Sequence, residues 1–220
     1  LALAQWIGEQ TGATVGYLTE AANTVGAQWV QAQPQKDGKN AGEMLTGAIK
    51  AAILLNTEPA FDAAAGAKGL EQADMVITLS PFKANLDISD VLLPVAPFTE
   101  TSGTFVNAEG RVQSFHAVVK PLGETRPAWK VLRVLANLLE LPGFDYESSQ
   151  DVLTAAIGAE TKEVPSALRS NITKVAAKVP ENEAAEPVTA SIYQLDGIVR
   201  RATSLQLTAD ARLAREGGAA

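Results

Sequence analysis

The sequence predicts an α/β fold, with a Rossmann-like parallel sheet and flanking helices, a following β-hairpin and a mostly helical C-terminal extension. Three patterns predict it. Short apolar runs of strand length alternate with helical stretches between residues 43 and 95. A β-favouring run broken by turn residues follows near residue 110, and apolar residues recur at helical spacing beyond residue 144.

The first elements lead into the sheet. Residues 3–10 favour the end of a helix that Gly12 stops, and residues 13–18 favour a short strand. Residues 43–49 favour a short helix. The run AAILL at residues 51–55 is continuous and apolar, which is typical of a buried parallel strand.

The alternation continues after this first strand. The Ala-rich residues 61–72 favour a helix, and DMVITL at residues 74–79 favours a second buried strand. A third strand is expected at residues 89–95, ended by Pro94 and Pro97. Strands that alternate with helices through short connections predict a parallel sheet with right-handed crossovers.

The hairpin is predicted by turn chemistry. Residues 104–106 and 111–115 are β-favouring, and between them Asn107 to Gly110 supplies a turn in which Gly110 suits a left-handed position. Glu109 and Arg111 flank this glycine, where an ion pair or backbone hydrogen bonds would fix the turn.

The rest of the chain is expected to be mostly helical. A helix is predicted over residues 125–140, with Thr125 as its cap and Pro127 in its first turn. Further elements are expected in chain order: helices at 149–159 and 166–178, an acidic linker at 179–189, an amphipathic helix at 191–206 and a frayed tail at 209–220.

Composition limits the function. The formal charge of −7 and the pI of 4.8 argue against a nucleic-acid partner, because phosphates would be repelled. The chain has no cysteine, so it holds no disulfide and no thiolate for zinc or an iron–sulfur cluster. No apolar run approaches the length of about 18 residues that a membrane span needs. The absence of an initiator Met or signal peptide suggests a piece of a longer protein.

The segment after residue 55 is where a Rossmann-like sheet would bind a dinucleotide. The chain there reads NTEPAFD, without the glycines of the fingerprint and with acidic residues where phosphate would sit, so dinucleotide binding is not expected. Asn56 to Pro59 is interpreted as a helix cap, with Asn56 or Thr57 capping and Pro59 in the first turn. The alternative is a loop that reads a ligand.

Four other features have simple structural interpretations. His116, the one histidine, is expected to be a surface or packing residue, and Trp6 and Trp129 are expected to be core anchors. The pair Arg200-Arg201 is interpreted as the wet face of the last helix, or alternatively as a contact to an acidic partner subunit.

Several phrases carry a resemblance to a known family. They are, in chain order, LLNTEPAFD (54–62), ADMVITLSPF (73–82), LLPVAPFTETSGTFVNAEGRVQ (92–113), PLGETRPAWKVLRVLANLL (121–139) and IYQLDGIVRRATSLQLT (192–208). Together they resemble the molybdopterin oxidoreductase superfamily and, within it, the large iron–sulfur subunit in the peripheral arm of bacterial respiratory complex I, the NADH:quinone oxidoreductase.

The resemblance implies an organisation and a role. Residues 1–99 would be a Rossmann-like domain of the molybdopterin oxidoreductase type with a truncated start, residues 100–143 a hairpin and helix that complete it, and residues 144–220 a helical extension with linker and tail. The fragment would have no cofactor, no catalytic residue and no metal ligand of its own, because the iron–sulfur clusters of the family lie in the N-terminal part of the parent subunit. A structural role is expected for the family-motif residues Gly103, Thr104, Asn107, Glu109, Gly110, Arg111 and Gln113.

The implied partners are the other subunits of the peripheral arm of complex I, on the cytoplasmic face of the bacterial inner membrane. Two other functions stay open. The chain could belong to an active molybdopterin-dependent oxidoreductase in which the loop after Leu55 and the hairpin near Gly110 contact pterin or guanine nucleotide. It could also be a free-standing module that binds a small molecule.

Overall fold

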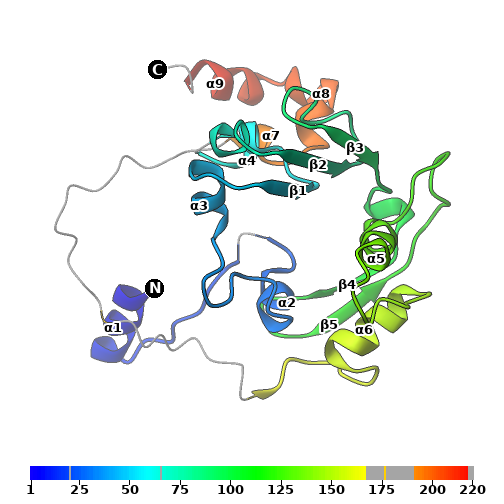
Figure 1. Cartoon of the computed structure of the whole chain (residues 1–220). Coiled ribbons are helices and arrows are strands. Elements are labelled where there is room, and N and C mark those ends of the chain that lie inside the picture. Colours follow the sequence, from blue (N-terminus) through cyan, green and yellow to red (C-terminus); the bar gives the residue numbers. More distant parts are fainter. Residues whose placement is uncertain (20, 65, 167–175, 177–190, 218–220) are drawn as a thin grey trace. The chain divides into compact units, whose positions relative to one another are not determined.

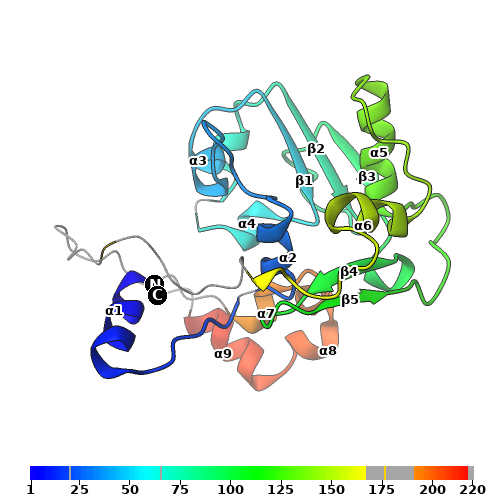
Figure 2. The ribbon, with the colours of Figure 1, turned by 90° about the horizontal axis from the view of Figure 1, so that it is seen from below.

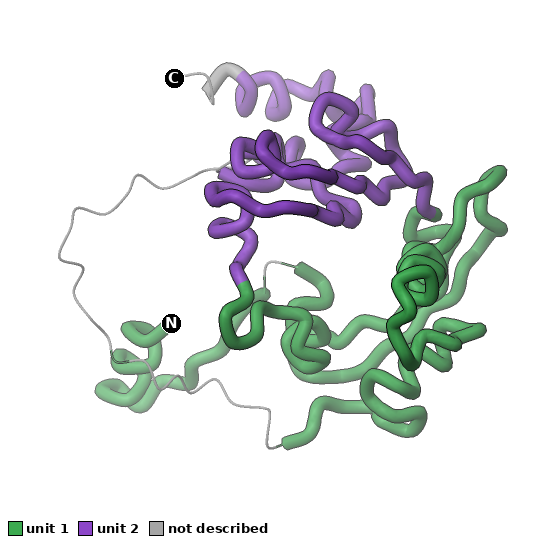
Figure 3. The backbone as a smooth tube through the Cα atoms, in the orientation of Figure 1, with its two compact units in different colours: residues 1–38, 96–184 green, residues 39–95, 185–220 purple. Residues whose placement is uncertain are grey.

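A computed structural model describes residues 1–19, 21–64, 66–166, 176 and 191–217. The chain groups into two compact units (Figure 3). Unit 1 comprises residues 1–38 and 96–184, and unit 2 comprises residues 39–95 and 185–220. Each unit therefore combines two segments that are distant in the sequence. The three-part division of the chain stays a prediction.

Unit 2 contains the predicted parallel sheet. Its strands are β1 (Ala51–Leu55), β2 (Met75–Ser80) and β3 (Val91–Pro94), hydrogen-bonded in the order β1-β2-β3 and all parallel (Figure 1, Figure 2). Val76, Thr78 and Leu79 of the central strand are fully buried, as is Val95 just after β3. The α/β class is therefore confirmed. Pro94 pairs opposite Ser80 as the last residue of its strand.

The helices of unit 2 come from both segments. From the first segment come α3 (Ala41–Thr46), α4 (Pro59–Asp62) and the 3₁₀ turn η1 (Lys68–Leu70). From the second come α7 (Ile192–Leu195), the 3₁₀ turn η4 (Val199–Arg201), α8 (Thr203–Gln206) and α9 (Ala209–Gly217). A capping box between Asn40 and Glu43 begins α3.

The helix expected at residues 61–72 was wrong, because the described residues of this stretch form only the short elements α4 and η1. Two glycines explain the break. Gly66 has φ of 61°, a left-handed value that ends a helix. Gly69 lies so close to α3 that a Cβ at this position would clash with the carbonyl oxygen of Leu45.

The single helix expected at residues 191–206 was also wrong. Asp196 adopts an extended conformation after α7, and its carboxylate accepts hydrogen bonds from the amides of Ile198 and Val199. This side chain stops one turn and starts the next. The tail expected from residue 209 is instead the helix α9, with Ala211 buried at 1% exposure.

Unit 1 contains the hairpin and the two longest described helices. Its elements are α1 (Ala2–Thr11), α2 (Thr24–Trp29), the 3₁₀ turn η2 (Phe98–Glu100), β4 (Gly103–Val106), β5 (Val112–Phe115), α5 (Ala128–Leu138) and α6 (Ser149–Ile157). The strands β4 and β5 pair antiparallel, as predicted (Figure 2). Gly12 ends α1 with φ of 72°, which confirms its predicted role.

Three predictions for unit 1 were wrong. Residues 13–18 form no strand, and Val15 instead packs against α1, where a Cβ on Gly8 would lie 2.5 Å from the Val15 side chain. Thr125 does not cap α5, because Pro127 occupies the N-cap position and the Thr125 hydroxyl donates to the carbonyl of Leu122. Trp6 is 53% exposed and is no core anchor.

Two predicted segments cannot be compared with the structure. Of the helix expected at 166–178, only residues 166 and 176 are among the described residues, and the linker expected at 179–189 lies entirely outside them. Among the described helices, none is long and apolar enough to cross a membrane.

Candidate functional site

The loop after β1 is held by its own side chains and by the loop after β2. Asn56 turns the chain with φ of 51°, and the amide of Asn85 donates to the carbonyl of Thr57 at 2.9 Å. Pro59 begins α4, as predicted, but neither Asn56 nor Thr57 caps it. Glu58 holds the N-cap position, and its backbone amide donates to the Asp62 carboxylate at 2.7 Å. The Glu58 side chain is therefore left free for another partner.

That partner is an arginine pair from the second segment of unit 2. Arg201 donates to both carboxylate oxygens of Glu58, at 2.7 and 2.9 Å, in a bidentate pair. Arg200 donates to Asp62 at 2.8 Å and lies 3.7 Å from Glu58. We call these four residues, Glu58, Asp62, Arg200 and Arg201, the arginine clasp.

The clasp is shielded from solvent. The side chain of Arg200 is 7% exposed and that of Glu58 is 11% exposed. The hydrogen bond to Glu58 raises the pKa of Arg201 further above its already high ordinary value. Two charges of each sign meet here, so the cluster as a whole is neutral.

Two aromatic rings complete the clasp. The guanidinium of Arg200 lies 4.7 Å from the centre of the Phe61 ring, and that of Arg201 lies 4.3 Å from the Phe82 ring. Phe82 follows β2 and Glu58 follows β1, so the arginines contact loops at the carboxyl ends of two neighbouring strands. This is the edge where open α/β sheets bind ligands.

The interpretation of Arg200-Arg201 as a wet helix face was wrong for Arg200, whose side chain is 7% exposed, while Arg201 is more exposed but ion-paired. The acidic residues that both arginines bind here belong to the same chain, and the alternative contact to an acidic partner subunit stays a prediction. The Nε and Nη1 atoms of Arg200 are buried without a hydrogen-bond partner among the described residues. These two unused donors lower the net stability that the clasp provides.

The hairpin turn is fixed by one asparagine. The side-chain oxygen of Asn107 accepts hydrogen bonds from the amides of Glu109 and Arg111, at 3.1 and 2.9 Å. Gly110 has φ of 84° and is buried, and its carbonyl accepts from the amide of Val164. An ion pair between Glu109 and Arg111 or hydrogen bonds of the backbone were expected to fix the turn, and hydrogen bonds of the backbone amides are what the structure shows. The side chains of Glu109 and Arg111 are both exposed.

The other motif residues lie on the hairpin strands. Gly103 faces the Phe115 ring, where a Cβ would lie 2.7 Å from a ring carbon. The hydroxyls of Thr104 and Ser114 share a hydrogen bond of 3.0 Å, and Gln113 pairs with Phe105. His116 follows this strand and is exposed. These contacts account for the motif residues structurally, and their lack of a cofactor contact stays a prediction.

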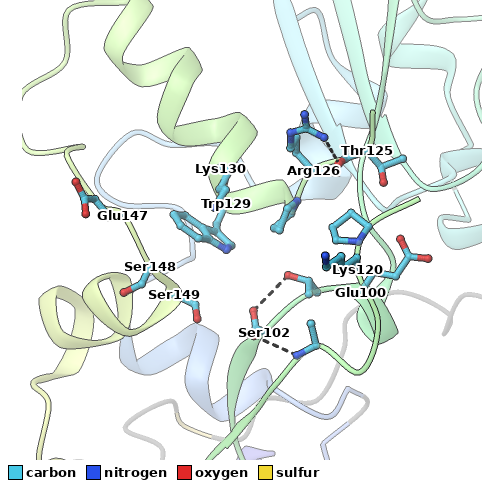
Figure 4. A pocket seen from close by; sticks show the side chains of 14 residues that line it. Glu100, Ser102, Lys120, Thr125, Arg126, Trp129, Lys130, Glu147, Ser148 and Ser149 are labelled. Carbon is cyan, nitrogen blue, oxygen red and sulfur yellow. Dashed lines mark hydrogen bonds between the residues drawn. The ribbon is translucent and has the colours of Figure 1, made fainter. Parts of the chain in front are cut away.

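A second candidate site lies within unit 1 and was not predicted. It is a pocket of about 580 Å³ between the start of β4, the segment after β5 and the first turns of α5 and α6 (Figure 4). Lys120, Arg126, Trp129 and Lys130 line it, together with the acidic residues Glu100 and Glu147. Trp129 is thus a half-buried pocket residue and no core anchor. The signal that could have indicated it is the clustering of three cations around Trp129 in residues 120–130.

The charges of this pocket are only partly compensated. The side chain of Arg126 lies 3.5 Å from that of Glu124, but Glu124 is 95% exposed, so this pair is weak. The ammonium group of Lys130 lies 5.3 Å from the centre of the Trp129 ring. Glu100 accepts a hydrogen bond from the amide of Leu122.

A comparison with models of known protein families shows to which family the chain belongs. The family model of molybdopterin oxidoreductases matches residues 2–138, which is more than half of the chain. The chain belongs to the molybdopterin oxidoreductase family.

Curated relatives of this molybdopterin oxidoreductase segment match a shorter stretch. A putative formate dehydrogenase of Staphylococcus aureus strain bovine RF122 is 39% identical over 77 residues, which are 34% of the chain and 8% of the relative. The probable oxidoreductase YjgC of Bacillus subtilis strain 168 is 40% identical over 70 residues, which are 32% of the chain and 7% of the relative. The matched stretch thus spans less than a tenth of these proteins.

The family implies a molybdopterin cofactor, whose fit depends on free donors at the site. A phosphate-bearing pterin needs free backbone amides or cations. At the carboxyl edge of β1 and β2, Arg200 and Arg201 are both bound to carboxylates, while Lys83 after Phe82 is exposed. The two clasp arginines of this edge, Arg200 and Arg201, are therefore not free donors for such a cofactor. Among the described residues, no three His, Cys, Asp or Glu side chains form a group that could hold a metal ion.

Proposed function

We propose that this chain is the C-terminal, cofactor-free part of the large iron–sulfur subunit of a bacterial NADH:quinone oxidoreductase, where it has a structural and subunit-docking role. Electrons would pass through iron–sulfur clusters in another part of the same subunit. The proposed location is the peripheral arm of complex I on the cytoplasmic face of the inner membrane.

The arginine clasp is the observation that carries this proposal. In an open α/β fold, the carboxyl edge of the sheet is the usual place for a ligand. Here two arginines from the second segment of unit 2 bind the acidic side chains of that edge. An edge closed by ion pairs of the chain itself suits a family member that supports a larger assembly and performs no chemistry at this position.

The phrase IYQLDGIVRRATSLQLT at residues 192–208 also supports the proposal. It resembles the complex I subunit in particular and contains both clasp arginines. The resemblance and the ion pairs thus concern the same residues.

A second candidate is part of an active molybdopterin-dependent oxidoreductase. The names of the relatives favour it, because they are putative formate dehydrogenases and a probable oxidoreductase. In that case residues outside this chain would supply most of the cofactor contacts, and the clasp would be a local structural feature.

Metal analysis of the purified parent protein tests the two candidates. The complex I candidate predicts iron without stoichiometric molybdenum or tungsten, together with copurification of other complex I subunits. Molybdenum or tungsten at one atom per protein would contradict it and support the second candidate.

Residues 1–220 alone provide a further test. The isolated chain is expected to oxidise no NADH and to bind no iron, because it contains no cysteine. A visible absorption band of an iron–sulfur cluster that persists through purification would overturn this expectation.

A further inference from the structure

The segment after β5 holds large apolar side chains in solvent. Val118 is 82% exposed, Val119 is 55% exposed and Leu122 is 78% exposed, and Phe98 nearby is 63% exposed. We call these four residues the apolar rim. Isolated apolar residues on a surface are ordinary, but several large exposed apolar side chains on two neighbouring segments are typical of interaction sites.

The backbone of this segment is fixed although its side chains are exposed. The amides of Val118 and Val119 both donate to the carbonyl of Thr99, at 2.9 and 3.4 Å. The amide of Leu122 donates to the Glu100 carboxylate at 2.9 Å. Thr99 follows Phe98 directly, so these hydrogen bonds bring the two parts of the apolar rim together. A surface held in place in this way loses little conformational entropy when a partner binds.

The pocket lies beside the apolar rim, and its three cations outnumber its two acidic residues, Glu100 and Glu147. Lys120, which stands between the rim residues Val119 and Leu122 in the chain, lines the pocket together with Arg126 and Lys130. Among the described residues, the ammonium group of Lys120 has no hydrogen bond or ion pair. Figure 4 shows Trp129 and Lys130 between Lys120 and Arg126 on one side and the serines that begin α6 on the other.

The start of α5 increases the positive potential of the pocket. This helix of 11 residues has no acidic residue in its first turn, and no side chain caps it at Pro127. Cations are unfavourable at the positive end of a helix, yet Arg126 and Lys130 stand there. The arrangement would be stabilised by a carboxylate from outside the chain.

We propose that the pocket and the apolar rim together dock an acidic segment of another polypeptide. A carboxylate of that segment would enter the pocket between Lys120 and Arg126, and apolar side chains on either side of it would cover the rim. The proposal specifies the docking role stated under the proposed function and rests on it for the identity of the neighbour as a subunit of the same assembly.

A polypeptide fits this surface better than a small anion. The apolar rim offers contacts to apolar side chains, which a phosphate or a free carboxylate does not have. The Trp129 ring is covered by Lys130 on one face, which reduces the area on which a flat ligand could stack. Charge complementarity also fits, because charged groups at the edge of an interface guide association.

Photocrosslinking in the assembled parent protein tests the proposal. Val118 is replaced by p-benzoyl-phenylalanine in the full-length protein, the native assembly is irradiated, and crosslinked peptides are sequenced by mass spectrometry. The expected product joins Val118 to a different polypeptide, at a segment in which Asp or Glu stands next to apolar residues. Crosslinks only within the chain, or none, would overturn the proposal.

Charge reversal provides the matched control. In the protein that carries p-benzoyl-phenylalanine at position 118, the double substitution K120E with R126E is expected to reduce the crosslink yield at least about ten-fold. Both substituted side chains would then repel the carboxylate of the partner that the native cations attract. The control pair K50E with K68E changes the net charge equally at lysines of unit 2 and is expected to leave the yield unchanged. Equal yields in both double variants would contradict the cationic part of the proposal.

A small-anion site is distinguished by titrating isolated residues 1–220 with inorganic phosphate. The expected result is no saturable shift of the Trp129 indole signal in NMR spectra, and saturation at submillimolar phosphate would replace the proposal by a small-anion site. The outcome is independent of metal content. Molybdenum in the parent would overturn the proposed function, while the crosslink would still decide whether this surface docks a polypeptide.

Discussion

Individual residues determine how firmly unit 2 is closed, and the arginine clasp is the clearest case. The side chain of its acidic residue Glu58 is 11% exposed and is bound by Arg201 through two hydrogen bonds. Removal of one partner from a buried pair costs more than the pair contributes, because the other charges stay buried.

We expect Glu58→Gln to destabilise unit 2 by about 3 kcal/mol, the low end for a broken buried pair. The low end applies because the Arg201 side chain is 32% exposed and can reach water. Hydrogen exchange of the β1 and β2 amides, followed by mass spectrometry, measures the loss. The matched variant Glu124→Gln removes the exposed partner of Arg126 and is expected to cost less than about 0.5 kcal/mol. Equal effects of the two variants would contradict the importance of burial.

A second residue-scale prediction concerns the hairpin turn. Asn107→Ala removes the acceptor of two backbone amides and is expected to destabilise the hairpin by about 1 to 2 kcal/mol. Glu109→Gln is the control and is expected to be nearly neutral, because its side chain is exposed. Urea unfolding monitored by tryptophan fluorescence reports on unit 1, since all three tryptophans lie there.

At this scale, sequence reasoning succeeded for local contacts and failed for distant ones. The positive φ of Gly110 and the stop at Gly12 follow from residue type and neighbours, so both could be predicted. The partners of Arg200 and Arg201 lie 138 and 143 residues away. No local pattern contains that information, and the exposed helix face was the natural but incorrect interpretation.

Secondary-structure elements were predictable where the apolar pattern was strong. The strand at residues 51–55 forms with the predicted bounds, because a run of five apolar residues between polar neighbours suits a parallel strand. It is not the buried strand that was expected, because β1 lies at an edge of the sheet and Ile53 and Leu55 are 48% and 40% exposed. The Ala-rich stretch 61–72 failed because helix propensity is a weak preference. Close packing at Gly69 and the left-handed Gly66 outweigh it.

The capping box of α6 gives a prediction at the scale of an element. The Asp151 carboxylate accepts from the amides of Glu147 and Ser148, and the hydrogen bond from Ser148 is the main cause that lowers the Asp151 pKa. A carboxyl group whose folded-state pKa is lowered stabilises the fold above its unfolded pKa and loses this contribution as the pH falls through the folded value. The start of α6 should therefore weaken below about pH 4.

NMR titration of the side-chain carboxyl carbons checks this expectation. Asp151 should titrate at lower pH than aspartate in an unfolded peptide. In Asp151→Asn, the amide signals of α6 should lose their pH dependence in that acidic range. Titration of Asp151 at the ordinary aspartate pKa would rule out the proposed role of the capping box.

For the whole molecule, the discontinuity of the units is the main feature that the sequence could not reveal. Residues 191–217 belong with the sheet of residues 51–94, although residues 96–166 of unit 1 stand between them in the chain. Local patterns identify elements, but grouping depends on distant contacts such as the arginine clasp. The unit 1 pocket was missed for a similar reason, because its lining comes from four separate segments.

A deletion tests the dependence of unit 2 on its second segment. We expect removal of residues 191–220 to lower the hydrogen-exchange protection of β1 and β2 by at least about a hundred-fold, because Glu58 and Asp62 would lose both cations. Removal of residues 1–12, which contain α1 of unit 1, is the control and should leave this protection unchanged. Unchanged protection in the first deletion would show that the clasp is dispensable for the sheet.

The placement of the clasp arginines near position 200 also has a consequence during synthesis. A ribosome produces Glu58 and Asp62 well over a hundred residues before it produces Arg200 and Arg201. Until then the nascent sheet carries two acidic groups without their counter-ions. Completion of unit 2 is therefore postponed until those arginines have been translated, and chaperones would find the sheet accessible throughout that interval.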